Sequence, residues 1–451
     1  MRALVITALL VASAAVAHAA ERLAIEACDY PNAAAAAAAW KPVENADAVQ
    51  LAPEKTPDGK PALAFRCDMP RMKERAYWDR SVALNLARFG RITFWVKGVG
   101  DATAIGGCNL YFNAGKGWYG ATFAPLGSTW QRIVLDRGAF GTEGTPEGWS
   151  AIRGLRLAFW KAQPRRITVY LGPIETVSTD VVVVRNARVG DEAQTYSELA
   201  SSILLRAGID VGTVDDVDVE EGVLQGKQIA VYPLNPQPSE KELDAVEAFV
   251  REGGRVLACY AQHPRMAALL GLEGMTHQRA EYPGQFSRMR FVPDAPPGFP
   301  AEVRQASWNI ERVRPAGQGA RVLAEWQDGE GKATGFPAII LSNTGAYVSH
   351  VLLRDDAENK QRMLAALLGY LRPEIWETTT RNALARAGEF GRWRTFGAAE
   401  RGIRALAKQT GRTATVEPEL AAARRAYALA NSHRNARRFT EVLEPAAEVQ
   451  R

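Results

Sequence analysis

The sequence has few of the residues that bind metals or form redox centres. It contains only four cysteines and five histidines in 451 residues. No C-x-x-C or H-x-x-x-H spacing occurs, so the ligand pattern of a zinc site is missing. A zinc site is therefore not expected, and the sequence points to no cofactor.

Charge of one sign and long apolar runs are also scarce. The net charge is only +5, and the charged residues are spread along the chain. No basic stripe alternates with aromatic residues, so the sequence does not predict nucleic-acid binding. Beyond the N-terminus, no segment offers the roughly 18 uncharged apolar residues that a membrane-spanning helix needs.

The first residues have the features of a secretory signal peptide. Arg2 provides the positive start, Leu4 to Val16 form a short apolar core, and Ala17-His18-Ala19 is an A-x-A cleavage site. We therefore expect residues 1–19 to be removed and the mature protein to be periplasmic or extracellular. An uncleaved N-terminal anchor is the alternative.

Export would permit disulfide bonds. Cys28 and Cys67 lie in one early region, where they either pair or stay free. Cys108 and Cys259 are expected to be free.

Residues 20–178 are predicted to be all-β. Short strand-like runs recur and are separated by glycine, proline and asparagine: ALAFRCDM, RITFWVKGV, CNLYFNAG, GWYGATFA, WQRIVLD, IRGLRLAFW and RITVYLGPIE. Such regularly spaced short strands are typical of a β-sandwich or jelly roll.

Residues 179–373 change to an alternation of apolar strands and amphipathic helices. The strands are DVVVVRN, GKQIAVYPL and RVLACYA. The helix QTYSELASSILLRAG ends near Gly208, and SEKELDAVEAFVREGG begins at Ser239 with a capping box that Glu242 would complete. This alternation predicts a parallel sheet with helices on both faces, an α/β flavodoxin-like domain.

Residues 374–451 are rich in arginine and alanine, and their apolar residues recur at helical spacing. They contain too few apolar residues to form a compact domain alone. We expect a helical linker, or helices that bind a protein partner.

Two groups of motifs resemble a known family. RAYWDRSVALNLARFGRITFWVKG, NLYFNAGKGWYGATF and EGTPEGWSAIRGLRLAFWKA resemble a galactose-binding-like, carbohydrate-binding β-sandwich. VVVVRNARVGDEAQTYSELASSILLRAGIDV, GGRVLACYAQHPRMAALLGLEG and AYVSHVLLRDDAENKQRMLAALLGYLRPEIW resemble a class I glutamine-amidotransferase-like domain. Secreted bacterial family-10-like glycosylhydrolases carry both in this order, and the similarity covers about residues 25 to 380.

The resemblance implies a role in polysaccharide processing. In this family a catalytic barrel follows a helical linker, whereas the present sequence stops at Arg451, where that barrel would begin. The chain is therefore expected to be non-catalytic, or a fragment of a longer hydrolase. Sandwiches of this type often hold a structural calcium ion, but no acidic cluster in the sequence marks a site.

Cys259 is the weak candidate for a catalytic residue. An amidotransferase needs a cysteine in a G-x-C-x-G elbow, but Leu257 and Ala261 replace the two glycines. His350 is predicted within the strand AYVSHVLL, about 13 Å short of the place expected for the catalytic histidine. His263 is better placed to cap a helix. We interpret Cys259 as a buried structural residue.

Carbohydrate binding is the better-supported expectation. Sugars need aromatic rings for their C–H faces and polar groups for their hydroxyls. Within NAGKGWYG, Trp118 and Tyr119 are adjacent, so one should face outward and one inward. The candidate contacts in the sandwich region are Trp118, Tyr119, Asn113, Lys116, Trp78 and Trp149.

Trp95 and Trp160 end strongly apolar strand-like runs and are expected in the core. The sequence therefore predicts an exported, non-catalytic protein that binds a glycan through its sandwich and uses the α/β domain as a scaffold. The alternatives are a hydrolase acting on glycans or amides at the α/β domain, and an envelope protein that binds other proteins.

Overall fold

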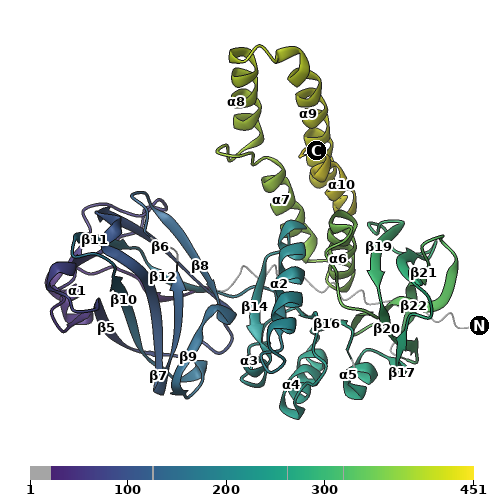
Figure 1. Ribbon diagram of the computed structural model, residues 1–451, viewed down its shortest axis with the longest axis horizontal. Helices are drawn as coiled ribbons and strands as arrows, with labels where there is room; N and C mark the ends of the chain where they lie inside the picture. The colour runs from purple at the N-terminus through teal and green to yellow at the C-terminus, as the bar shows by residue number, and fades with distance from the viewer. Residues whose placement is uncertain (1–21, 124–125, 262, 318, 451) are drawn as a thin grey trace, which may run out of the picture.

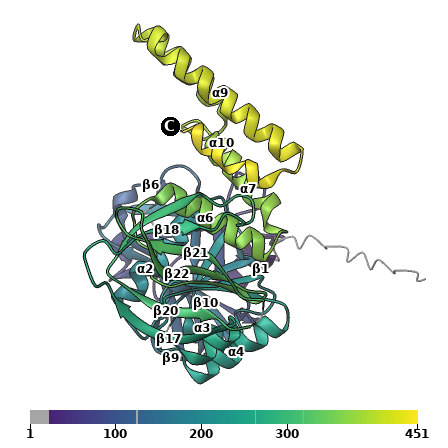
Figure 2. The same cartoon turned by 90° about the vertical axis from the view of Figure 1, so that its right-hand side faces the viewer.

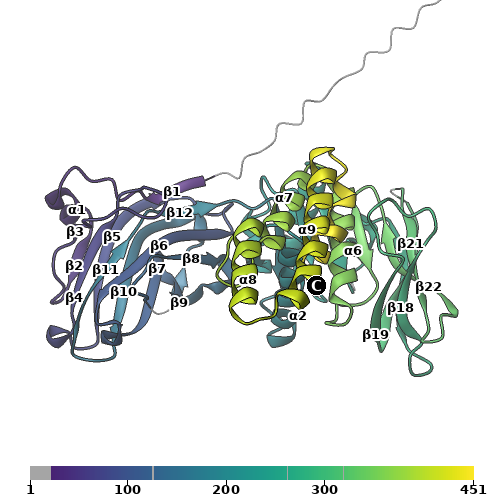
Figure 3. The same cartoon turned by 90° about the horizontal axis from the view of Figure 1, so that it is seen from above.

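A computed structural model describes residues 22–123, 126–261, 263–317 and 319–450 of the chain (Figure 1). The predicted signal peptide, residues 1–19, lies outside these ranges. A β-sandwich comes first, an α/β region follows it, and the C-terminal helices extend from the α/β region. Figure 3 shows the sandwich at one end of the long axis and strands β18 to β22 at the other. Within the described residues, no helix is long and apolar enough to cross a membrane.

The sandwich consists of two antiparallel sheets, named here the front sheet and the back sheet. The front sheet has the order β2 (Lys41–Val43), β5 (Arg75–Leu84), β10 (Ile152–Lys161), β7 (Ile105–Phe123), β9 (Gly141–Pro146). The back sheet has the order β1 (Arg22–Glu26), β12 (Ile174–Val177), β6 (Arg91–Gly100), β11 (Arg166–Leu171), β4 (Leu63–Asp68), β3 (Gln50–Leu51), with β8 (Gln131–Asp136) also paired to β6. Helix α1 (Ala33–Ala39) follows β1. The all-β prediction for this region is confirmed.

Strand β7 turns back on itself. Trp118 lies seven residues after Tyr111, which is about 23 Å along an extended strand. The two rings nevertheless approach to a centroid distance of 6.4 Å, and Asn109 donates a hydrogen bond to Thr122 at 2.9 Å. The turn includes Gly115, whose φ of 65° favours glycine. The two halves of β7 therefore lie side by side in the front sheet.

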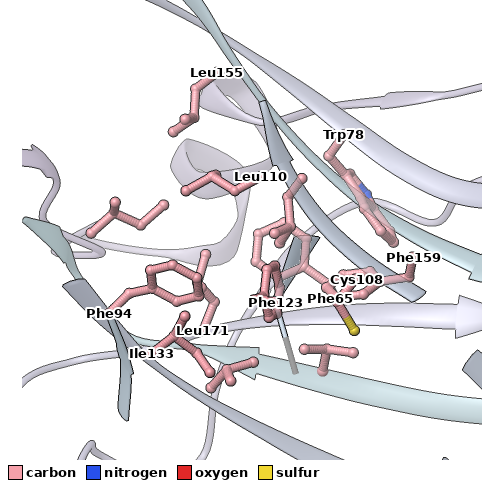
Figure 4. Packing of buried hydrophobic residues seen from close by; sticks show 14 of the residues in the cluster. Phe65, Trp78, Phe94, Cys108, Leu110, Phe123, Ile133, Leu155, Phe159 and Leu171 are labelled. Atoms are coloured by element: carbon pink, nitrogen blue, oxygen red, sulfur yellow. The ribbon is translucent and has the colours of Figure 1, made fainter. Parts of the chain in front are cut away.

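The core of the sandwich lies between the two sheets (Figure 4). The front sheet contributes Trp78 and Phe159, and the back sheet contributes Phe65 and Phe94. Trp78 is fully buried, and its ring meets Phe65 edge to face at 5.1 Å. Alternate residues of each strand thus fill the interior and leave the residues between them on the outward faces.

All four cysteines are buried and free. The thiol of Cys28 donates a weak hydrogen bond to the carbonyl of Leu171, which pairs with Leu63 on the neighbouring strand. Cys67 lies four residues beyond Leu63, about 13 Å along β4. The Cys28–Cys67 disulfide is therefore not formed, because a disulfide needs Cα atoms within about 7 Å.

A mixed sheet forms the centre of the α/β region. Its order is β14 (Val211–Asp215), β13 (Val181–Arg185), β15 (Ile229–Tyr232), β16 (Arg255–Cys259), β23 (Gly345–Val348), β22 (Ala333–Leu341), β21 (Arg321–Gln327), β18 (Phe286–Phe291), β19 (Glu302–Ser307). The strands from β14 to β23 are mutually parallel, and those from β22 to β19 extend the sheet with antiparallel pairing. The parallel strands agree with the sequence pattern, whereas the antiparallel extension was not predicted.

Helices cover both faces of the parallel strands. Helices α2 (Asp191–Arg206) and α6 (Ala357–Leu371) pack on one core, and α3 (Asp216–Glu220), α4 (Glu240–Arg251) and α5 (Pro264–Leu269) pack on the other. As predicted, the chain leaves α2 at Gly208, whose φ is 93°, and Ser239 caps α4. The capping box is not formed, because the buried carboxyl group of Glu242 instead accepts a hydrogen bond from Asn235 at 2.7 Å.

Strands β17 (Leu272–Arg279) and β20 (Asn309–Pro315) form a small separate ribbon. The chain ends in helices α7 (Ile375–Ala387), α8 (Phe396–Gln409), α9 (Thr413–Asn435) and α10 (Leu443–Glu448). Helices α7, α9 and α10 share a small apolar core, and Arg362 of α6 pairs with Glu444 of α10. The α8–α9 hairpin projects away from the body of the molecule (Figure 1), and Figure 2 shows α9 extending beyond it.

Charged side chains join the sandwich to the α/β region. Arg137, after β8, pairs with Asp218 of α3 at 3.4 Å, and both side chains are buried. Arg91 of β6 pairs with Asp210 at 2.5 Å. Because breaking a buried pair leaves one charge without a partner, the Arg137–Asp218 contact favours a fixed junction.

Candidate functional site

Alternation along two strands of the front sheet places a set of polar and aromatic residues on its outward face. In β5, Ala76 and Trp78 point into the core, whereas Arg75, Tyr77 and Asp79 belong to the opposite face. The neighbouring strand β10 continues these rows. The outward residues of β10 lie directly opposite those of β5: Trp160 pairs with Arg75, Ala158 with Tyr77, and Arg156 with Asp79. With Tyr111 and Trp118 of β7, these residues define the front face.

Guanidinium groups and aromatic rings alternate across the front face. The guanidinium carbon of Arg75 lies 4.7 Å from the ring centre of Trp160 and 4.5 Å from that of Tyr77. The guanidinium carbon of Arg156 lies 4.8 Å from Tyr77 and 4.5 Å from Trp118. Each cation is therefore attracted to two ring faces, and the row is held in place across three strands.

Hydrogen bonds orient the members of this row. Both nitrogens that Arg156 presents to Asp79 donate to its carboxylate, at 2.6 and 2.8 Å. These hydrogen bonds to Asp79 raise the pKa of Arg156 above its ordinary value. The indole nitrogen of Trp160 donates to Asn109 at 2.9 Å. The arrangement is therefore preorganised rather than a loose group of surface side chains.

Gly120 makes room for one of the rings. A Cβ at this position would lie 2.6 Å from the ring of Tyr111, which is closer than atoms can approach. The glycine therefore leaves room for the ring of Tyr111, which meets the ring of Trp118 edge to face. Burial raises the pKa of Tyr111, so its hydroxyl stays protonated at neutral pH.

The adjacent residues Trp118 and Tyr119 face opposite sides, as the sequence predicts. Trp118 is half-buried on the front face. Tyr119 points into the core and stacks on Trp149 at a centroid distance of 4.3 Å. Asn113 and Lys116 lie at the β7 turn, where Asn113 donates to the carbonyl of Gly117 and Lys116 is exposed.

Three of the predicted contacts are not available to a ligand. Trp78, Tyr119 and Trp149 are all buried in the sandwich core, because they occupy inward positions of the alternation. Conversely, Trp95 and Trp160 were expected in the core but lie half-buried on outward faces, one residue after the inward Phe94 and Phe159. The sequence prediction also missed Arg75 and Arg156 as members of the front face. The period-2 spacing of Arg75, Tyr77 and Asp79 was the signal for Arg75, whereas the place of Arg156 depends on the register of β10 with β5.

The front face offers what a sugar chain needs. The half-buried rings of Trp118 and Trp160 can pack against C–H faces, and the guanidinium groups and Asp79 can donate to and accept from hydroxyls. Tyr77 is buried beneath the two guanidinium groups and supports the row from within. No hydrogen bond or ion pair engages the guanidinium of Arg75 within the described ranges, so its donors remain for a ligand.

The carboxyl edge of the parallel strands is organised differently. Cys259 ends β16 and is fully buried, and this burial raises the pKa of its thiol to about 12. A thiol with this pKa is not a nucleophile at neutral pH. The residue at the elbow is instead Tyr260, whose φ of 48° is strained for a tyrosine.

His350 lies at this edge and not within a strand. Strand β23 ends at Val348, and the His350 ring lies 5.6 Å from that of Tyr260 and 4.7 Å from that of Trp308. Burial lowers the pKa of His350 to about 4, so the imidazole is neutral at neutral pH. His263 accepts a hydrogen bond from the backbone of Arg265, which confirms its predicted capping role.

A structural calcium ion is not supported by the residues present. In the part of the chain that the structure describes, no group of three or more histidine, cysteine, aspartate or glutamate side chains could hold a metal ion. The one carboxylate of the front face, Asp79, is engaged by Arg156.

No protein-family model and no curated protein matches the sequence. Among solved structures, the chain is similar to the family 11 carbohydrate-binding module of a cellulosomal cellulase from Clostridium thermocellum. That match has 12% identity, 36% coverage of this chain, 96% of the module and a TM-score of 0.27. It is also similar to a ThuA-like protein from Bacteroides uniformis, with 14% identity, 42% and 90% coverage and a TM-score of 0.33. A family 30 carbohydrate-binding module matches with 14% identity, 31% and 77% coverage and a TM-score of 0.24.

Proposed function

We propose that the protein binds a polysaccharide along the front face. The observation that carries the proposal is the row of Trp118, Arg156, Tyr77, Arg75 and Trp160 on one outward sheet face. The row crosses three strands, so it suits several consecutive sugar units rather than one. The rings supply apolar contact, and the fixed charged groups select the orientation of the chain.

We further propose that this binding serves a polysaccharide-processing protein in the periplasm or outside the cell. The motifs of residues 25 to 380 resemble family-10-like glycosylhydrolases, and the signal-like N-terminus supports export. In this proposal residues 20–178 bind the glycan, residues 179–373 are an amidotransferase-like, flavodoxin-like scaffold without catalysis, and the helices of residues 374–451 bind a protein partner.

A hydrolase acting at the carboxyl edge is the second candidate. The strained backbone of Tyr260, beside His350 and Trp308, favours it, because strain of this kind gathers at functional sites. Turnover of a glycan or amide by the purified protein that is abolished by His350→Gln would support this candidate over the first.

Native gels cast with soluble polysaccharides test the first proposal. A panel of mixed-linkage β-glucan, xylan, galactomannan, pectate and alginate should contain at least one polymer that retards the protein. Trp118→Ala should weaken that retardation at least tenfold, because its ring would no longer contact the chain. Phe390→Ala is the control, since Phe390 is 53% exposed and lies between helices α7 and α8, outside the sandwich and the carboxyl edge. Retardation that Trp118→Ala leaves unchanged would contradict the front-face site.

A further inference from the structure

The back sheet carries a second polar hollow on the opposite side of the sandwich. This back cleft has a volume of about 140 Å³. It is lined by Arg22, Asp58, Lys60, Thr93, Phe94, Trp95, Arg132, Pro173 and Glu175. An engineered protein cavity of about 150 Å³ holds one benzene molecule, so the back cleft has the size for a single six-membered ring.

Register brings the key side chains of the back cleft together. Thr93 of β6 pairs with Glu175 of β12, and two residues further along β6, Trp95 pairs with Arg132 of β8. Trp95 is half-buried and provides an aromatic surface in a lining that is otherwise mostly polar. Gly172 lets the neighbouring loop approach, because a Cβ there would lie 3.2 Å from the Cβ of Trp95.

One wall of the back cleft is a network of partly exposed charged side chains. Lys60 pairs with Glu175 at 2.5 Å and lies 4.0 Å from Asp58, and Arg22 lies 3.5 Å from Glu175. Asp58 is held by Thr56, which donates to it at 2.5 Å. Arg132, on the other wall, makes no hydrogen bond or ion pair within the described residues. Donors and acceptors therefore alternate around the cleft.

We infer that the back cleft binds one neutral pyranose unit, such as the terminal sugar of a glycan. The ring of Trp95 would take a C–H face, and the carboxylates and cations would bind the hydroxyls. The lining has three cations and two carboxylates, and its small net charge of +1 disfavours a strongly charged ligand. This inference goes beyond the proposed function, because the front face would bind along a chain and the back cleft would bind one unit.

Saturation-transfer NMR with methyl glycosides of glucose, galactose, mannose and xylose tests the back cleft. At least one of these should bind with a dissociation constant of about 1 mM, as expected for a ligand of this size. Trp95→Ala should weaken binding at least tenfold. Arg132→Ala is the second variant, because Arg132 is exposed and its removal should not disturb folding; it should weaken binding about threefold. Phe390→Ala should bind as the unmodified protein does.

Other results would overturn the inference. Binding that survives both Trp95→Ala and Arg132→Ala would place the sugar elsewhere, and so would loss of binding in Trp118→Ala alone. Absence of binding by all four methyl glycosides, or binding of methyl glucuronide only, would contradict a neutral pyranose site. The retardation by polysaccharides is measured separately with Trp118→Ala, so failure of the back cleft leaves the front-face proposal intact.

Discussion

Aromatic and polar side chains gather both on the front face and at the carboxyl edge of the parallel strands, but the two regions differ in how far these side chains are exposed to solvent. On the front face, Trp118 and Arg156 are half-buried and open to solvent. At the carboxyl edge, Cys259, His350 and Glu242 are fully or almost fully buried. The difference teaches that residue type alone does not mark a site, because a ligand must also reach the groups that would bind it.

The largest expected difference concerns two tryptophans in the sandwich. Trp78→Ala should lower the free energy of unfolding by about 3–5 kcal/mol, because it empties a fully buried position. Trp118→Ala should cost less than about 1 kcal/mol, since the ring is already partly in water. Urea unfolding of both variants measures the contrast. Equal losses would show that Trp118 is a core residue and would weaken the front-face account.

A pH-dependent effect should distinguish the carboxyl edge. Burial raises the pKa of Glu242 to about 8, so the folded state holds this proton while the unfolded state has already released it. The contribution of Glu242 to the free energy of unfolding is therefore fully present below the pKa that Glu242 has in the unfolded state. It decreases as the pH rises toward 8. Glu242→Gln removes the titration and keeps an acceptor for Asn235.

Urea unfolding at pH 5, 7 and 9 measures this effect. Between pH 5 and pH 9, the free energy of unfolding of Glu242→Gln should rise by on the order of 3 kcal/mol relative to that of the unmodified protein. Glu240→Gln is the control on the same helix, because Glu240 lies in the first turn with a largely exposed side chain. A constant difference across the pH range would mean that Glu242 is charged in the folded protein.

The smallest effect is expected from thiol reagents. All four cysteines are buried, and burial raises the pKa of Cys108 and of Cys259 to about 12. Iodoacetamide should therefore modify none of them in the folded protein within minutes and all of them after denaturation. Rapid labelling of Cys259 with loss of an amidase activity would instead indicate that Cys259 is a catalytic residue.

The sequence was sufficient to predict those features that depend on a single strand or helix. Adjacency alone predicted that Trp118 and Tyr119 face opposite sides, and local signals identified Gly208, Ser239 and His263 as helix-end residues. The β-sandwich also followed from the spacing of short strands. These features depend on alternation and capping, which are local properties of the chain.

The sequence was insufficient where the outcome depends on pairing between distant strands. The partnership of Arg156 with Tyr77 and Asp79 needs the register of β5 and β10, because Arg156 and Asp79 lie 77 residues apart in the sequence. Trp160 was assigned to the core because its strand is apolar, although its neighbour Phe159 takes the inward position. Glu242 was assigned to a capping box, but tertiary contact with Asn235 redirects its side chain.

The most direct test of the account is fluorine NMR of the protein labelled with 5-fluorotryptophan, with a retarding polysaccharide or its oligosaccharides added. Resonances are assigned with single Trp→Phe variants. The account predicts that the signals of Trp118 and Trp160 shift, whereas those of the buried Trp78 and Trp149 do not. Saturable binding that leaves both Trp118 and Trp160 unchanged would contradict the proposal that the front face binds the glycan.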